Sequence, residues 1–191
     1  MLPHSLYLAP ANVAAVPAPE KIQAILERLE VIGPALGKDI FEAGGGFARH
    51  VVFAGCSPYL VMTPPEDGSL AFCHVAVHGP FDLPHLVTGL QAPRPRCPHC
   101  RHRFTDWRDL LGAEREMRSL RCPSCHRGVT SCELDWRQHA VCGRVLIELR
   151  NVFPGEAVPS DQLMQALCAE TAMEWQYGWA QYLSIDQANT T

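Results

Sequence analysis

Two pairs of cysteines constrain the fold of this chain more than any other feature. Cys97 and Cys100 form the first pair, Cys122 and Cys125 form the second, and 21 residues lie between the pairs. Two residues between cysteines let both thiolates reach one ion from a tight turn, and Zn²⁺ takes four such ligands in a tetrahedron at about 2.3 Å. The spacing predicts one zinc ion held by all four thiolates.

Each pair reads Cys-Pro-x-Cys, and the segment of about residues 94–130 resembles the zinc ribbon family. In that family, two such turns, called knuckles, stand at the tips of β-hairpins and hold one structural zinc. The resemblance implies that the four paired cysteines are the ligands and that Zn²⁺ is the cofactor. It covers this segment only and implies nothing about the rest of the chain.

The chain departs from the family at the residue after each second cysteine. This residue is often Gly in zinc ribbons, whereas here it is Arg101 and His126. The turn geometry is therefore open, and His126 or His102 is an alternative to one thiolate. With four thiolates the site has no position for water or substrate, so we expect it to be structural rather than catalytic.

The formal net charge of −4 conceals a change of sign along the chain. Residues 94–127 carry nine arginines and four acidic groups, a net charge of +5, whereas residues 1–93 carry −4 and residues 128–191 carry −5. Any surface that attracts a polyanion must therefore lie in the middle segment. The candidate partner-binding residues are Arg101, Arg103, Trp107, Arg118, Arg121 and Arg127.

These arginines have more than one interpretation. With Phe104 and Trp107 as stacking surfaces, they have the composition of a nucleic-acid-binding ribbon. Four thiolates and one Zn²⁺ also leave a charge of −2, which nearby arginines offset in a protein of any function. We expect a non-catalytic zinc-binding protein whose ribbon docks onto a protein partner, and a nucleic-acid-binding regulator is the alternative.

An enzyme is a third hypothesis. Cys56 lies at a predicted turn, where His50, His74 or His78 could activate its thiol, and the same histidines could form a second metal site. A free cysteine is more often a small buried apolar residue, so we assign no catalytic residue. Two further sets of residues are expected to be core: Cys132 with Cys142, and Trp175, Tyr177 and Trp179.

The remaining sequence predicts an α+β protein, with a mixed or antiparallel sheet, flanking helices and the ribbon as an insert. Residues 1–93 are expected to form the N-terminal part of the α+β domain, and residues 94–130 the zinc-ribbon insert. Residues 131–191 are expected to form the C-terminal part of the same domain.

Periodicity and turn residues place the expected elements. Residues 1–18 are expected to form an extended arm, and residues 19–32 and a segment from Asp161, with Ser160 as its N-cap, are predicted helices. Predicted strands cover residues 47–54, 59–63, 70–78 and 141–149, the second and third of these forming a hairpin. Residues 174–184 fit strand and helix spacing, with a slight preference for a strand.

Two features bear on the compartment. No apolar run approaches the roughly 20 residues that span a bilayer. No Lys or Arg precedes Lys21, and three prolines interrupt the apolar N-terminus, so it does not fit a signal peptide. Paired cysteines with metal-ligand spacing are typical of a reducing compartment. The sequence therefore predicts a cytoplasmic protein that does not cross a membrane.

Overall fold

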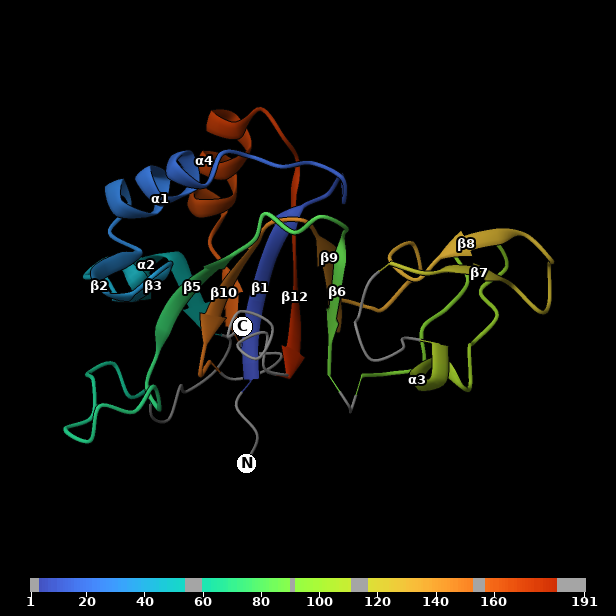
Figure 1. Ribbon diagram of the computed structural model, residues 1–191, viewed down its shortest axis with the longest axis horizontal. Coiled ribbons are helices and arrows are strands. Elements are labelled where there is room, and N and C mark those ends of the chain that lie inside the picture. Colours follow the sequence, from blue (N-terminus) through green and yellow to red (C-terminus); the bar gives the residue numbers. More distant parts are fainter. Residues whose placement is uncertain (1–3, 54–59, 90–91, 111–116, 153–156, 182–191) are drawn as a thin grey trace.

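The computed structural model describes residues 4–53, 60–89, 92–110, 117–152 and 157–181. Its main element is a six-stranded sheet in the order β12-β1-β10-β5-β3-β2, in which all neighbouring strands are antiparallel (Figure 1). With helices beside this sheet, the chain has the predicted α+β fold. The strands are β1 (His4–Pro10), β2 (Ile32–Gly37), β3 (Ile40–Ala43), β5 (His74–His78), β10 (Leu146–Arg150) and β12 (Trp175–Gln181).

Strand β1 lies inside the sheet, so the prediction of an extended N-terminal arm is wrong. It pairs with β10 on one side and with β12 on the other. Leu6 and Leu8 point to one face and Tyr7 and Ala9 to the other, because side chains alternate along a strand, and all four are fully buried. Three prolines in the first 17 residues argue against a strand, but Pro10 is the last residue of β1.

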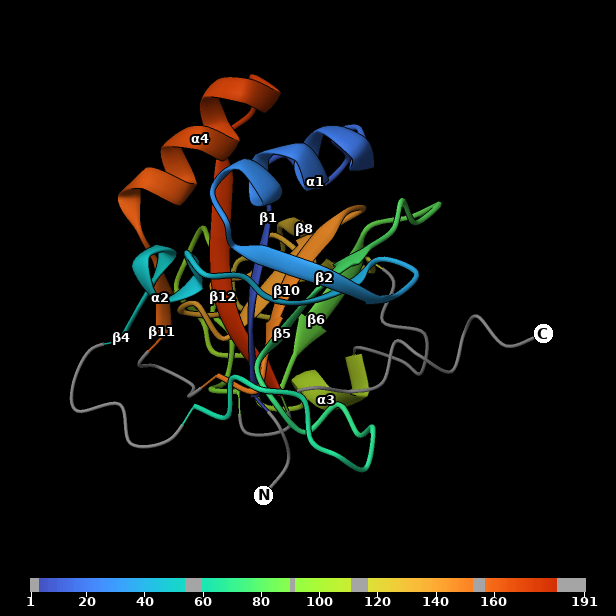
Figure 2. The same cartoon turned by 90° about the vertical axis from the view of Figure 1, so that its left-hand side faces the viewer.

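Two helices cover the face of the sheet that carries Leu6 and Leu8 (Figure 2). They are α1 (Pro19–Arg28) and α4 (Asp161–Thr171). Ser160 caps α4 as predicted, since its side-chain oxygen accepts a hydrogen bond from the backbone N–H of Leu163. None of the described helices is long and apolar enough to cross a membrane.

The other face of the sheet packs against a two-stranded ladder, β6 (His85–Thr88) with β9 (Ala140–Gly143). Residues 89–139, here called the insert, leave from the end of β6 and return at the start of β9. Figure 1 shows the insert at one end of the long axis, with β2 and β3 at the other. The regular elements in its described part are α3 (Trp107–Leu110) and the hairpin β7 (Ser119–Arg121) with β8 (Gly128–Thr130).

Two predicted elements differ in length or type. Helix α1 ends at Arg28, and Ile32, expected at its C-terminus, begins β2. The predicted strand at residues 47–54 begins instead as the short helix α2 (Phe47–His50), and only β4 (Val51–Phe53) is extended. Strand β4 pairs with β11 (Ala157–Pro159) outside the main sheet.

The predicted strands at residues 59–63, 70–78 and 141–149 are also corrected. Among the described residues from 60 to 78, only β5 is a strand, although the N–H of Cys73 donates to the carbonyl of Val61 at 2.7 Å. The segment 141–149 holds two strands, because the chain leaves the ladder after Gly143 and enters the main sheet at Leu146. The preference for a strand near residues 174–184 is confirmed by β12, which pairs with β1 along its whole length.

Candidate metal centre

The side chains of Cys97, Cys100, Cys122 and Cys125 converge in the insert. Their four sulfur atoms lie within 4.8 Å of one another, with Cys97 Sγ 3.8 Å from Cys125 Sγ and Cys100 Sγ 3.6 Å from Cys122 Sγ. A tetrahedral ion with Zn–S bonds of about 2.3 Å requires sulfur atoms about 3.8 Å apart. The four thiols can therefore hold one metal ion. This arrangement is called the sulfur cage below.

The two cysteine turns have the same backbone geometry. In each, the N–H of the first cysteine donates to the carbonyl five residues later, and the N–H four residues later donates back to the carbonyl of the first cysteine. The two bonds of the first turn are Cys97 to His102 at 2.8 Å and Arg101 to Cys97 at 3.0 Å. Those of the second are Cys122 to Arg127 at 3.0 Å and His126 to Cys122 at 2.9 Å.

The two turns keep this geometry although Arg101 and His126 stand where zinc ribbons often have Gly. Both residues have a left-handed backbone, with φ of 63° and 58°, the conformation that glycine adopts most readily. Within the described part of the chain, the group that can hold a metal consists of the four cysteines, and neither His102 nor His126 belongs to it. Both histidine alternatives to a thiolate are therefore absent from this site.

The cage is partly buried and polar. Cys97 and Cys122 are fully buried, whereas Cys100 is exposed. A hydrogen bond from the backbone of Cys125 favours the charged form of Cys122 and lowers its pKa to about 6. Thiolates are the form of cysteine that binds metal. Four sulfur ligands leave no open coordination position, which fits a structural ion rather than a catalytic one.

The residues around the first turn tie it to the end of the insert. Arg96 forms isolated β-bridges with both Arg103 and Asp135. The guanidinium of Arg101 lies 2.7 Å from the Asp135 carboxylate, and this ion pair is solvent-accessible. The charge of Arg101 is thus partly neutralised within the insert.

Phe104, Trp107 and Trp136 form the apolar centre of the insert. They are 6%, 3% and 5% exposed, and the two indole rings meet edge to face at a centroid distance of 5.2 Å. Arg108 lies over the ring of Trp107, with its guanidinium carbon 4.5 Å from the centroid. Trp107, a candidate partner-binding residue, therefore packs in the interior, while the candidates Arg101, Arg103, Arg118, Arg121 and Arg127 are all exposed.

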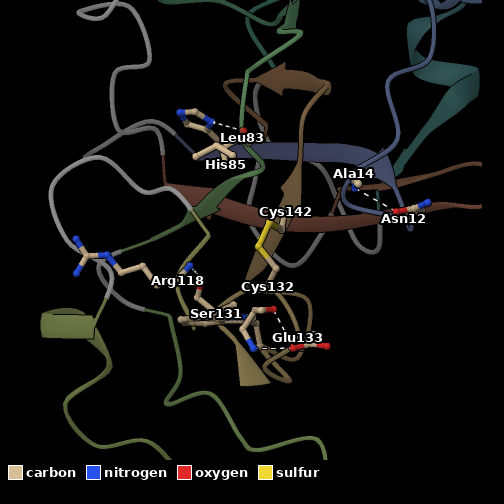
Figure 3. The surroundings of a disulfide bond; sticks show 11 residues. Asn12, Ala14, Leu83, His85, Arg118, Ser131, Cys132, Glu133 and Cys142 are labelled. Carbon is tan, nitrogen blue, oxygen red and sulfur yellow. Dashed lines mark hydrogen bonds between the residues drawn. A yellow bond between two sulfur atoms is a disulfide. The ribbon is translucent and has the colours of Figure 1, made fainter. Parts of the chain in front are cut away.

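A disulfide joins the insert to the body of the protein. Cys132 lies just after β8 and Cys142 lies in β9, and their Cα atoms are 5.6 Å apart (Figure 3). Beside it, the hydroxyl of Ser131 accepts a hydrogen bond from the N–H of Arg118. Both cysteines pack in the core cluster of the insert, as expected, but the sequence did not indicate that they are bonded to each other.

The histidines of the enzyme hypothesis have separate environments, and Cys56 lies outside the described residues. His50 contacts the hydroxyl of Ser160 at 3.3 Å, and a ring nitrogen of His74 lies 2.7 Å from the carbonyl of Phe72. His78 contacts a carboxylate of β10. In the described residues, these histidines belong to no metal-ligating group.

Sequence reasoning missed the buried carboxylate of Glu148. It is fully buried and accepts hydrogen bonds from Ser5, Tyr7, His78 and Arg150 at 2.6–2.8 Å. Burial alone would raise its pKa, but the bond from His78 and the charge of Arg150 lower it to about 2. Burial and the nearby carboxylate raise the pKa of Tyr7. The sequence signal that could have revealed this buried carboxylate is a single acidic residue within the apolar run Val145–Leu149.

Comparison of the chain with protein-family models, curated proteins and solved structures gave no match.

Proposed function

We propose that the chain is a non-catalytic zinc-binding protein, in which a zinc ribbon presents an arginine-rich surface to an acidic protein partner. The convergence of four thiols with the separations of a zinc tetrahedron carries the proposal. The ion would be structural, and the partner would contact side chains on the outside of the insert.

The charge of the insert favours an interaction surface over charge compensation alone. The insert carries ten arginines and six acidic groups, a net charge of +4, and four thiolates with one Zn²⁺ contribute −2, which leaves +2. The net positive charge of the insert therefore exceeds the negative charge of the metal site. Arg103, Arg118 and Arg121 are exposed, and no ion pair involves their side chains among the described residues.

The position of the aromatic residues favours a protein partner over a nucleic acid. Proteins that bind single strands stack successive bases on accessible aromatic side chains. Phe104, Trp107 and Trp136 are each more than nine-tenths buried. The insert thus offers positive charge without an exposed Phe or Trp ring in its described part, a combination better suited to carboxylates than to stacked bases.

Metal analysis of the purified chain tests the metal half of the proposal. We expect about one zinc ion per chain, and four additional reactive thiols after chelation. A variant with Cys97 and Cys122 both changed to Ser should lose the zinc, whereas Cys73→Ser, which alters a buried cysteine outside the cage, should retain it. Zinc-free protein in the native state, or a zinc ion that survives loss of the cage cysteines, would contradict the proposal.

Oligonucleotide titration tests the choice of partner. At salt near physiological concentration, we expect a fluorescent single-stranded oligonucleotide to bind weakly, and its binding to respond little to Arg103→Ala or Arg121→Ala. Binding that weakens steeply with salt and with each arginine removed would instead identify a nucleic-acid-binding regulator.

A further inference from the structure

A pocket of about 280 Å³ lies next to the sulfur cage. One wall comes from the residues just after the first cysteine turn, including Phe104, Thr105 and Asp106. The other comes from β7 and the start of the second turn, including Leu120, Arg121 and Pro123. Small-molecule sites usually measure about 300–1,000 Å³. The volume is below that range and suits a single anchoring side chain.

The metal site holds the two walls together. Thr105 follows Cys100 by five residues, and Pro123 directly follows Cys122, so the ligands of a shared ion lie next to both walls. The two turns contribute no other covalent link to each other among the described residues. The pocket is therefore expected to exist only when the cage is filled.

The lining defines the chemistry of what can enter. Phe104, Leu120 and Pro123 supply apolar surface, Arg121 supplies a positive charge and Asp106 a negative one. The carboxylate of Asp106 disfavours a phosphate inside the pocket, whereas a bulky apolar side chain meets no charge conflict. Arg121 is exposed and can pair with a carboxylate next to that side chain.

We propose that this pocket binds one bulky apolar side chain of an acidic peptide segment in the partner, with Arg121 contacting a neighbouring carboxylate. This inference rests on the proposed function and identifies the partner's recognition element. The net charge of +2 on the metal-loaded insert complements an acidic segment. Interaction hot spots are typically side chains that fill a well-packed pocket inside a polar rim.

A peptide array tests the inference on the full zinc-loaded chain. The probes are fluorescent peptides of Asp and Glu with one central Leu, Ile, Met, Phe or Trp, and matched peptides with Ala at that position. We expect at least one apolar residue to give binding about tenfold tighter than Ala. Chelation should abolish the difference, and readdition of zinc should restore it.

Two variants and one matched control locate the binding. Thr105→Trp fills the pocket from an exposed position, and Arg121→Glu reverses its charge. Each should weaken binding of the best peptide by about tenfold or more. Arg118→Glu makes the same charge reversal at an exposed position outside the pocket lining, and should change binding by less than about threefold. Zinc content checks that each variant retains the folded insert.

The outcomes separate this inference from the proposed function. Acidic peptides that bind equally with Ala, or that respond equally to Arg118→Glu and Arg121→Glu, would overturn the pocket and leave a diffuse basic surface. Failure of every peptide in the array to bind would also overturn it. Tight oligonucleotide binding by the same zinc-loaded protein would contradict the proposal that the partner is a protein.

Discussion

Arg101 and His126 occupy equivalent positions in the two cysteine turns, and both have a left-handed backbone. The hydrogen bonds around them also correspond, since each residue's N–H donates to the first cysteine of its turn. The two turns are thus copies of one structure despite different sequences. The left-handed conformation of the fourth residue after the first cysteine therefore follows from the backbone hydrogen bonds of the turn and not from the chemistry of its side chain.

His126→Gly should stabilise the insert by about 0.5–1 kcal/mol. A side chain costs roughly 1–2 kcal/mol in the left-handed region, and the greater freedom of glycine in the unfolded chain cancels only part of that gain. Thermal unfolding of the zinc-loaded protein measures the effect. Arg127→Gly, one residue further and without positive φ, should be destabilising. Destabilisation by both variants would disprove the assigned turn geometry.

Removal of zinc should unfold the insert and spare the body. Structural zinc contributes about 10–16 kcal/mol, comparable to the roughly 5–15 kcal/mol that stabilises a whole domain. Hydrogen exchange should rise around Trp107 and Trp136, which pack in the insert, and stay low around Leu6 and Leu149 in the main sheet. Unchanged exchange in the insert after complete zinc removal would show that its core folds without metal.

The double variant Cys132→Ser, Cys142→Ser should keep its zinc but lose about 2–3 kcal/mol of stability. Neither sulfur belongs to the cage, and the disulfide closes a loop with a sequence separation of 10 residues, for which chain entropy predicts this magnitude. Denaturant unfolding under non-reducing conditions measures the loss. Cys168→Ser, at a half-buried free cysteine, is the control and should have a smaller effect. Zinc loss in the double variant would contradict the separation of the two sites.

Acid should weaken the body through Glu148. Because the folded pKa of about 2 lies below the ordinary value of 4.5, this carboxylate stabilises the fold above about pH 4.5 and loses that contribution as pH falls towards 2. The contribution is on the order of 3 kcal/mol. The free energy of unfolding of wild type should approach that of Glu148→Gln as the pH falls over this range, because wild type alone loses the carboxylate's contribution. Any zinc that acid releases is lost by both proteins and cancels in the comparison. A constant difference would show that Glu148 does not titrate as described.

The sulfur cage could be predicted from sequence because its information is local. Spacing brings two thiols together within each turn and predicts that the two pairs share one ion, which is also what the resemblance to zinc ribbons implies. The position of Trp107 could not be predicted, because a tryptophan among arginines suits an exposed stacking surface as well as an interior. Its burial depends on Trp136, which lies well beyond the second pair.

The fold class was predictable, but the sheet was not. Ser160 and the apolar spacing after it identified α4, since caps and helical periodicity act over a few residues. The position of β1 depends on pairing with β10 and β12, which no local pattern encodes. Likewise, Glu148 is tolerated inside the sheet only because Ser5, Tyr7, His78 and Arg150 come from three different strands.

The place of β1 between β10 and β12 also sets an order of events during synthesis. Both partners of β1 lie far along the chain from it, so Leu6 and Leu8 have no neighbouring strand until β10 has left the ribosome. The contacts of the sulfur cage, in contrast, are complete once residue 125 is available. Because non-local pairing is slow, we expect the insert to bind its metal while the body is still a nascent chain.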